Sequence, residues 1–211
     1  MPLEYERALW DGGVSRIAGV DEVGRGPIAG PVVAGAVVLS VGCGVAGATD
    51  SKVLAPGRRL ELAAEIEARA QAIAIGAASA REIDRLGILR ATARAMERAL
   101  ARLPERPDHV VVDGLPVAGL PWRHEAVVGG DALVHSVACA SIVAKVCRDR
   151  LMTRLAVRYP QYCWERNKGY ATPRHRRAVR EAGLTPHHRV SFGLRQLERR
   201  AGSSVGRATD F

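Results

Sequence analysis

Apolar residues gather in short β-rich runs along the first two thirds of the chain. From Arg16, the stretch RIAGVDEVGRGPIAGPVVAGAVVL holds two such runs around a Gly- and Pro-rich turn, which predicts a hairpin. The next segment, 44–57, is predicted as a loop with room for one short strand, and 71–79 (QAIAIGAAS) predicts another strand. The last strands are predicted at 109–114 (HVVVDG) and at the end of the turn-rich segment 115–130.

Helical patterns lie between and after these strands. Residues 58–70 (RRLELAAEIEARA) place apolar side chains on one helical face, and residues 79–103 form a helical pattern with a break near Gly87. The longest uninterrupted pattern covers 131–159, and it starts at an aspartate suited to cap a helix.

The order of these elements predicts an α/β fold in three layers, with a mixed central sheet between helices and a helical extension at the C-terminus. We expect residues 1–155 to form the main domain. Residues 156–200, with helical pieces around 173–182 and 192–200, are expected to pack on it. The tail 201–211 has little that could pack, and it is expected to be disordered.

The composition indicates a core made of small side chains. Of the 211 residues, 47% are hydrophobic and only 4% are aromatic, so alanine, valine, leucine and isoleucine must fill the interior. No apolar stretch reaches the roughly 18 residues of a membrane span, and the N-terminus lacks the apolar region of a signal peptide. The four cysteines show no C-x-x-C spacing and do not suggest a disulfide framework. We therefore expect a cytoplasmic protein.

Positive charge is concentrated in the last third of the chain. Residues 1–140 contain 15 basic and 17 acidic residues, whereas residues 141–211 contain 16 basic and 5 acidic residues. Of the 31 basic residues, 28 are arginine, whose planar fork can donate two hydrogen bonds to a phosphate. This asymmetry predicts a face that binds a polyanion, although an arginine-rich surface without any ligand would have the same composition.

Four carboxylates stand where predicted strands or helices begin or end, namely Asp21, Glu22, Asp113 and Asp131. Acidic side chains at the ends of apolar strands are costly to bury unless they bind a cation. Mg²⁺ takes oxygen ligands, and two such ions roughly 3.5–4 Å apart stabilise the attacking and the leaving oxygen in a phosphodiester displacement. The four acids together therefore indicate a metal-dependent nuclease.

Each acid also has a plain structural interpretation. Asp131 could be only a helix cap, Asp113 only a turn residue, and Asp21 with Glu22 only a solvated pair. Successive residues of a regular strand also point to opposite faces, so this pair cannot share one site from ideal strand geometry. The two glycines that follow could let the backbone turn sharply and bring both carboxylates round.

Eight sequence blocks carry a resemblance to a known family. They are D-E-V-G-R-G-P-I-A-G-P-V at 21–32, D-S-K at 50–52, V-D-G at 112–114, G-D-A at 130–132, A-S-I-V-A-K-V at 140–146, R-D-R-L at 148–151, K-G-Y-A-T-P-x-H at 168–175 and H-R-V-S-F at 188–192. In this order, the blocks resemble the bacterial ribonuclease HII family, the type 2 ribonucleases H. The resemblance implies a ribonuclease H-like three-layer fold.

The activity that this resemblance implies is endonucleolytic. Such an enzyme hydrolyses the RNA strand of RNA–DNA hybrids and nicks duplex DNA on the 5′ side of an embedded ribonucleotide, which serves the removal of ribonucleotides from DNA. A metal-activated water attacks the phosphorus, with two Mn²⁺ or Mg²⁺ ions, and the products end in a 3′-hydroxyl and a 5′-phosphate. The family's catalytic and metal-binding carboxylates fall on the four acids above, with Asp21 and Asp113 as the expected shared ligands.

The resemblance also implies substrate contacts. In the family, the turn that matches Gly24, Arg25 and Gly26 contacts the ribonucleotide through its backbone, and the tyrosine that matches Tyr170 stacks on the sugar beside the RNA–DNA junction. A backbone without side chains can approach the 2′-hydroxyl closely, and this group alone distinguishes RNA from DNA at one nucleotide. Further candidates for substrate contacts, each in or beside a motif, are Lys52, Ser141 and Lys168.

The chain departs from the family pattern near Asp131. Gly129 stands where a lysine is usual, and residues 133–135 replace a more polar stretch, so a substrate contact there could be missing. His187 and His188 have no cysteine or acid at ligand spacing, and they are expected to contact a loop or a phosphate.

The remaining charged and histidine residues have mostly structural interpretations. His135 is expected to be packed in the core rather than to bind a ligand. A solvated face is a reasonable interpretation of four basic side chains on the long predicted helix, which are Lys145, Arg148, Arg150 and Arg154.

Three other functions remain open. A non-catalytic duplex-binding module would explain the basic C-terminal third but not the acids, since acids repel phosphates unless cations intervene. Another nuclease on the same fold would lack the G-R-G turn and Tyr170, and the related ribonuclease HIII would carry an extra N-terminal domain. We expect RNA–DNA hybrids and ribonucleotide-containing duplex DNA as partners, no membrane, and a monomer, because no exposed apolar stripe argues for an oligomer.

Overall fold

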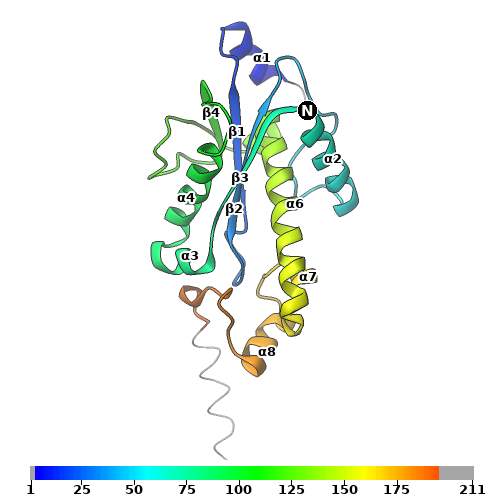
Figure 1. Cartoon of the computed structure of the whole chain (residues 1–211), viewed down its shortest axis with the longest axis vertical. Coiled ribbons are helices and arrows are strands. Elements are labelled where there is room, and N and C mark those ends of the chain that lie inside the picture. Colours follow the sequence, from blue (N-terminus) through cyan, green and yellow to red (C-terminus); the bar gives the residue numbers. More distant parts are fainter. Residues whose placement is uncertain (1–2, 195–211) are drawn as a thin grey trace, which may run out of the picture.

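The computed structural model describes residues 3–194 (Figure 1). Its strands are β1 (Ile17–Val23), β2 (Val32–Leu39), β3 (Ala70–Ala78), β4 (His109–Asp113) and β5 (Glu125–Val127). Its helices are α1 (Glu4–Asp11), α2 (Pro56–Arg69), α3 (Ala80–Leu86), α4 (Ile88–Leu100), α5 (Gly130–Leu133), α6 (His135–Arg158), α7 (Trp164–Asn167) and α8 (Pro173–Ala182), with 3-10 turns η1 (Pro160–Tyr162) and η2 (Val190–Phe192). The predictions for residues 195–211 lie outside the described residues.

The strands form one mixed sheet in the order β3-β2-β1-β4-β5. β1 pairs antiparallel with β2, and β2 pairs antiparallel with β3, whereas β1 with β4 and β4 with β5 are parallel. The predicted hairpin and mixed sheet are therefore confirmed. The short strand expected within 44–57 is wrong. Residues 44–55 form a loop whose apolar residues Val45 and Ala48 pack into the core with α2 and α6, and α2 begins at Pro56.

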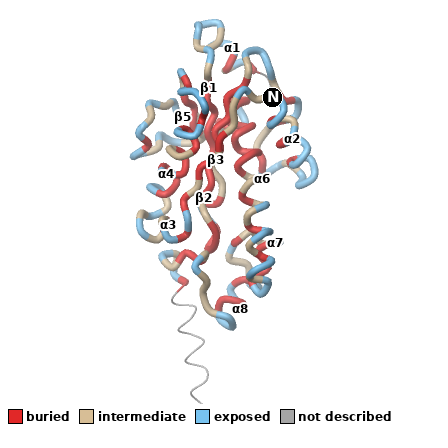
Figure 2. Tube along the Cα trace, in the orientation of Figure 1, coloured by how far each residue is buried: buried red, intermediate tan, exposed pale blue. Residues whose placement is uncertain are grey.

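Helices cover both faces of the sheet, which gives the three expected layers (Figure 1). All eight residues of β2 are buried, as expected for a central strand with a helix layer on each side. Ala18 and Val20 of β1 pack in the cluster with α4, whereas Val37 and Leu39 of β2 pack in the cluster with α2 and α6. Figure 2 shows this burial along the central strands and the inner side of α6.

Small residues allow the layers to approach closely. A Cβ atom added to Gly19 of β1 would collide with the backbone of Ser136 in α6, and one added to Gly76 of β3 would collide with the carbonyl oxygen of Ala95 in α4. The alanine- and glycine-rich composition therefore serves direct packing of helix backbone on sheet backbone, as the low aromatic content predicts.

The single helix predicted over 131–159 is wrong at its start. Val134 is extended and separates the short α5 from α6, and the N-cap of α5 is Gly129, in the left-handed region at φ 71°, not Asp131. The N-terminal helix α1 was not predicted. It places the buried Glu6 carboxylate at the start of α6, where Oε1 accepts hydrogen bonds from the Ser136 backbone N–H (2.7 Å) and hydroxyl (2.9 Å). A carboxylate at this position stabilises the helix N-terminus.

The C-terminal extension continues from α6 and packs at one end of the sheet (Figure 1). Tyr162 and Trp164 are buried in a cluster with Met152 and Val179, so both belong to the core of this extension. Helix α8 begins after the Thr172 cap and covers the predicted range 173–182. Within the described part of the chain, no helix is both long enough and apolar enough to span a membrane.

Candidate active site

The four predicted acids converge at one end of the sheet. Asp21 and Glu22 are near the end of β1, and Asp113 is the last residue of β4, the parallel neighbour of β1. Asp131 lies in the short helix α5, and the preceding Gly130 N–H donates a hydrogen bond of 2.7 Å to Asp113 Oδ1. This bond ties α5 to the end of β4, which brings the fourth acid to the strand ends.

Asp21 and Glu22 reach this site without a sharp turn. β1 stays paired with β2 as far as Val23, so the expectation that the following glycines bring both carboxylates round is wrong. The alternation along β1 places Asp21 with Gly19 on the face toward α6, and Glu22 with Val20 on the face toward α4. The acids still interact because both lie at the end of the strand.

Burial and nearby carboxylates raise the pKa of Asp21, Glu22 and Asp131. Burial, together with the negative charges of Glu22 and Asp113, raises the pKa of Asp21 to about 8. Burial also raises the pKa of Glu22, which the adjacent Arg25 partly offsets. The pKa of Asp131 is raised by burial and then by the charges of Asp113 and Asp50. The site therefore concentrates negative charge where water cannot screen it fully.

A divalent cation suits this donor set in chemistry and charge. All four side chains offer carboxylate oxygens, the ligands that Mg²⁺ and Mn²⁺ prefer, and a cation would relieve their mutual repulsion. Within the described residues, no group of three or more His, Cys, Asp or Glu side chains is gathered closely enough to hold a metal ion as it stands. The acids are thus near neighbours whose ligand atoms do not surround one point.

The G-R-G turn and Tyr170 border the same cleft. A cavity of about 420 Å³ is lined by Glu22, the turn 24–26 and Tyr170, among others. A Cβ on Gly26 would lie 3.7 Å from Cε1 of Tyr170, so ring and turn are direct neighbours. Tyr170 is 49% exposed, which excludes a core role. A second cavity, of about 440 Å³, adjoins at Glu22 and includes Asp113.

Lys52 and Ser141 also lie at the cleft, in different environments. The exposed Lys52 ammonium is 3.9 Å from Oδ2 of Asp131 and 3.9 Å from Oδ1 of Asp50. The buried Ser141 hydroxyl of α6 donates a hydrogen bond of 2.8 Å to Ser51 Oγ. Lys52 is thus exposed at the cleft, where it can meet an anion, whereas Ser141 anchors the D-S-K loop.

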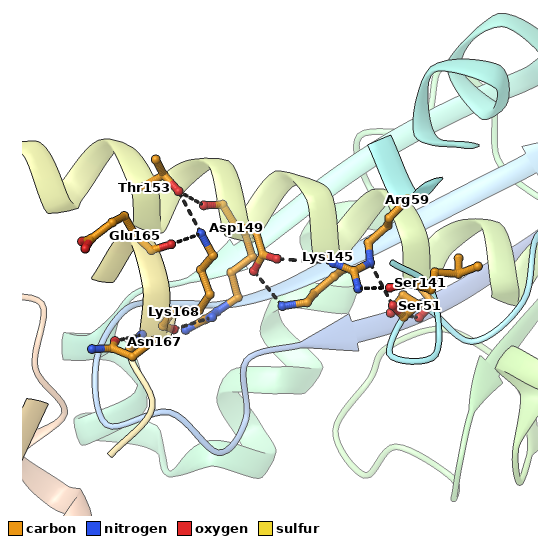
Figure 3. Close-up of polar contacts among 12 residues, drawn as sticks. Ser51, Arg59, Ser141, Lys145, Asp149, Thr153, Glu165, Asn167 and Lys168 are labelled. Carbon is orange, nitrogen blue, oxygen red and sulfur yellow. Dashed lines mark hydrogen bonds and ion pairs between the residues drawn. The ribbon is translucent and has the colours of Figure 1, made fainter. Parts of the chain in front are cut away.

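Lys168 is not in this cleft. Its ammonium donates to Thr153 Oγ1 (2.9 Å) and to the Glu165 carbonyl (2.7 Å), beside the α6–α7 junction (Figure 3). It lines another cavity of about 600 Å³, between α2, α6 and α7, which contains none of the four acids. The structure therefore separates Lys168 from the other predicted contacts.

Several contacts near the site are not apparent from the sequence. Asp50, quoted only within D-S-K, interacts with Asp131 and Lys52. Arg59 of α2 donates to the Ser51 carbonyl (2.8 Å) and faces Asp149 of α6 at 3.7 Å, and Lys145 donates to the same aspartate at 2.7 Å (Figure 3). The spacing of Lys145 and Asp149, four residues apart on a helix, was the available signal for this network.

Of the two histidines expected to contact a loop or a phosphate, His188 is internal, whereas His187 is only partly buried. His188 is 2% exposed, and its Nε2 lies 3.1 Å from Nε2 of the buried His175. Burial, together with the neighbouring His175 and His187, lowers the pKa of His188 to about 3. The buried position expected for His135 is confirmed, since it is 1% exposed.

Comparison with known proteins gives one consistent family. The model of the family described as Ribonuclease HII matches residues 18–195. A Ribonuclease HII of Thermosynechococcus vestitus is 55% identical, over 91% of this chain and 90% of that protein. The crystal structure of the ribonuclease H2 from Pyrococcus horikoshii OT3 superposes with a TM-score of 0.76 at 29% identity, covering 89% of this chain and 99% of that one.

A more distant structure shares the fold. Bst-RNase HIII in complex with Mn²⁺ superposes with a TM-score of 0.69 at 18% identity, covering 92% of this chain and 71% of that one. The ribonuclease H-like fold predicted from the motifs is thereby confirmed, and the alternative of a non-catalytic binding module is wrong. The chain belongs to the ribonuclease HII family and is a type 2 ribonuclease H, an endonuclease that acts on RNA–DNA hybrids.

Proposed function

We propose that this ribonuclease H also nicks duplex DNA on the 5′ side of a single embedded ribonucleotide, in the removal of ribonucleotides from DNA. The observation that carries this proposal is the contact between Tyr170 and the G-R-G turn beside Glu22. A ring next to a side-chain-free backbone can stack on one sugar while the backbone approaches its 2′-hydroxyl. Recognition then requires one ribonucleotide only.

Asp21, Glu22, Asp113 and Asp131 would hold two divalent ions, Mg²⁺ or Mn²⁺, with Asp21 and Asp113 shared between them. The ions would supply charge stabilisation for the attacking and leaving oxygens and would activate water. The solved Bst-RNase HIII carries Mn²⁺, which is consistent with this choice. The raised pKa of Asp21 supports the proposal, because buried acids that repel one another gain most from a bound cation.

The reaction adds water across the P–O3′ bond. The strand is left with a 3′-hydroxyl on one side and a 5′-phosphate on the ribonucleotide. The chain's own part is to hold the four carboxylates at the strand ends and to place the scissile phosphate there through Gly24, Arg25, Gly26 and Tyr170. Lys52, next to Asp131, is suited to contact a phosphate, and Ser141 supports the loop that carries it.

The domain division belongs to the same proposal. Residues 1–155 supply the four acids, and residues 156–200 supply Tyr170, so the substrate would contact both parts. The monomeric state and the cytoplasmic location expected from the sequence also remain proposals.

A duplex with one embedded ribonucleotide tests the proposed function directly. With Mg²⁺ or Mn²⁺, we expect one nick 5′ of the ribonucleotide, with the stated ends, and no cleavage after EDTA is added. Asp113→Asn should lower the rate by orders of magnitude while retaining the melting temperature and duplex binding, because the amide has the same shape but a weaker attraction for cations. Cleavage of long hybrids only, or a fully active Asp113→Asn, would contradict the proposal.

A further inference from the structure

Two buried arginines, Arg148 of α6 and Arg189, lie beneath the G-R-G turn, each with 0% of its surface exposed. The solvated face considered for Arg148 is therefore wrong. Arg148 donates three hydrogen bonds to backbone carbonyls, from Nε to Pro31 (3.0 Å), from Nη1 to Lys168 (2.9 Å) and from Nη2 to Ala29 (3.1 Å). It thus ties the loop before β2 to the turn that carries Tyr170.

Arg189 makes the equivalent contacts to the G-R-G turn itself. Its Nη2 donates to the Gly24 carbonyl (2.6 Å), its Nη1 to the Arg25 carbonyl (2.9 Å) and its Nε to the Gly30 carbonyl (2.9 Å). The two guanidiniums are close enough that the charge of Arg148 lowers the pKa of Arg189, after the larger effect of burial. We call Arg148 and Arg189 the arginine pair.

The arginine pair has no neutralising carboxylate nearby. Among the described residues, no acidic oxygen lies within 4.0 Å of either guanidinium. The acids that influence them most are engaged elsewhere, since Asp149 accepts from Lys145 (2.7 Å) and Asp84 accepts from the Val190 N–H (3.0 Å). Apart from the Phe192 ring, 5.2 Å from the Arg189 guanidinium, the partners of these two adjacent buried cations are carbonyl dipoles. Buried cations without a carboxylate partner are costly, so an anion that binds above them would be favoured.

The direction of the six hydrogen bonds determines what the turn presents to the cleft. In a trans peptide, the carbonyl of one residue and the N–H of the next point in opposite directions. Because Arg189 holds the Gly24 and Arg25 carbonyls inward, the N–H groups of Arg25 and Gly26 point away from the pair. Neither N–H has a protein acceptor within the described chain, and the turn lines the cleft. Successive free N–H groups form an anion-binding surface.

Gly24 is required by this packing. Its φ is 92°, and a Cβ there would collide with Nε of Arg148. The first glycine of the turn therefore allows Arg148 to lie directly under the backbone.

We propose that Arg189, supported by Arg148, is a positioning residue that aims the N–H groups of Arg25 and Gly26 at a phosphodiester oxygen next to the ribonucleotide, whose negative charge balances the arginine pair. This inference rests on the proposed function and specifies how the G-R-G turn recognises the strand. According to this proposal, the G-R-G turn binds a phosphate as well as the ribose.

Binding measured with modified duplexes tests this role. The duplex carries one ribonucleotide, and the phosphates on either side of it are replaced one at a time by an uncharged methylphosphonate, with EDTA present so that no cleavage occurs. In the wild-type protein, we expect one replacement to weaken binding by roughly tenfold, as for the loss of a charge-assisted hydrogen bond. In Arg189→Lys, which keeps the charge but not the three-pronged geometry, binding should be weaker and the same replacement should cost less than twofold.

Matched variants distinguish positioning from general stability. Arg98→Lys is the control, because Arg98 also donates to a backbone carbonyl, that of Ala77 at 2.7 Å, but on the α4 side of the sheet. It should keep the wild-type methylphosphonate penalty even if its melting temperature falls. Arg148→Lys is the second variant if Arg189→Lys is poorly folded, and it should also reduce the penalty.

Two results would overturn the positioning role. One is an unchanged penalty in folded Arg189→Lys and Arg148→Lys, and the other is no penalty at either phosphate in the wild-type protein. Failure of the proposed function would look different, since the wild-type protein would then bind but not nick the unmodified duplex when metal is added.

Discussion

The Asp21 carboxyl shows at the scale of one residue how burial prepares this protein for a cation. It is only 4% exposed, at a strand end beside two further acids, and its pKa of about 8 means that ionisation at neutral pH opposes folding. His188 has the opposite effect on the pH dependence of stability. Because its pKa is lowered, it is neutral in the folded protein and gains a proton on unfolding in acid, so acid destabilises the fold. A divalent ion bound by the acids would change this balance at the acids but not at His188.

The stability of the metal-free protein should therefore depend on pH through Asp21. A folded pKa of about 8 against an ordinary value of 3.8 means that stability decreases as pH rises between these values, by up to about 1.4 kcal/mol per pH unit. Urea unfolding in EDTA at pH 6, 7 and 8 measures the slope. The difference between wild-type protein and Asp21→Asn isolates Asp21 from the histidines, and parallel curves for the two proteins would contradict this prediction.

Tyr170 is a second residue whose role is local. Since its ring is half exposed beside Gly26, Tyr170→Ala should leave the melting temperature nearly unchanged. Loss of stacking worth roughly 1–3 kcal/mol should lower kcat/KM far more on a single embedded ribonucleotide than on a long hybrid, which offers other 2′-hydroxyls. Tyr170→Phe separates the ring from the hydroxyl. Equal losses on both substrates would remove Tyr170 from junction recognition.

At the scale of elements, the close packing of β1 against α6 holds the acids in place. Gly19 of β1 lies against the backbone of Ser136, and Glu6 of α1 accepts a hydrogen bond from the N–H of the same residue. The start of α6 is thus fixed between β1 and α1. Because α5 and Asp131 come directly before α6, this contact also determines where the fourth acid lies.

Gly19→Ala should accordingly destabilise the protein. The added Cβ must push two backbones apart, and such overpacking costs roughly 1–3 kcal/mol or more. Gly57→Ala is the matched control, because Gly57 lies in α2 with no atom within 4 Å of the added Cβ, and alanine is the better helix former. Thermal unfolding of both variants checks the difference. A Gly19→Ala protein as stable as Gly57→Ala would show that the layers can separate at no cost.

At the scale of the whole molecule, charge is divided between two regions. The acids occupy the strand ends, whereas Arg150, Arg154, Arg166 and Lys168 line the cavity of about 600 Å³ beside α6 and α7. In the proposed complex, a duplex at the acids would also extend past these basic side chains. Neutralised phosphates release counterions, so binding should weaken steeply with salt, at a slope of about −0.9 for each contact.

Replacing Lys168 tests this surface. Lys168→Gln should weaken binding to DNA duplexes and hybrids alike, and should flatten the plot of log K against log salt by about one unit. Arg94→Gln on α4, where Arg94 already pairs with Glu97 at 2.7 Å, is the control and should leave the slope unchanged. An unaltered slope in Lys168→Gln would mean that the ammonium, held by Thr153 and Glu165, only joins α6 to α7.

The sequence by itself determined the elements whose signals are local. The hairpin, the break at Gly87 and helix α8 follow from β-rich runs, glycine and a Thr-Pro start, which act within a few residues. The four acids were also recognisable, because each stands at the end of an apolar run and in a family motif. Helix α1 and the separation of α5 from α6 were not, since Glu6 and Ser136 meet across the fold.

Only the tertiary structure decided the environments of charged side chains. Arg148 belongs to a basic helical pattern that suits a solvated face, yet it is buried because carbonyls of residues 29, 31 and 168 surround it. Lys168 and Tyr170 are two residues apart in one motif but face different cavities. Burial and hydrogen bonding of a charge depend on partners more than a hundred residues away, as the contact of Arg189 with Gly24 shows, and no local pattern encodes such partners.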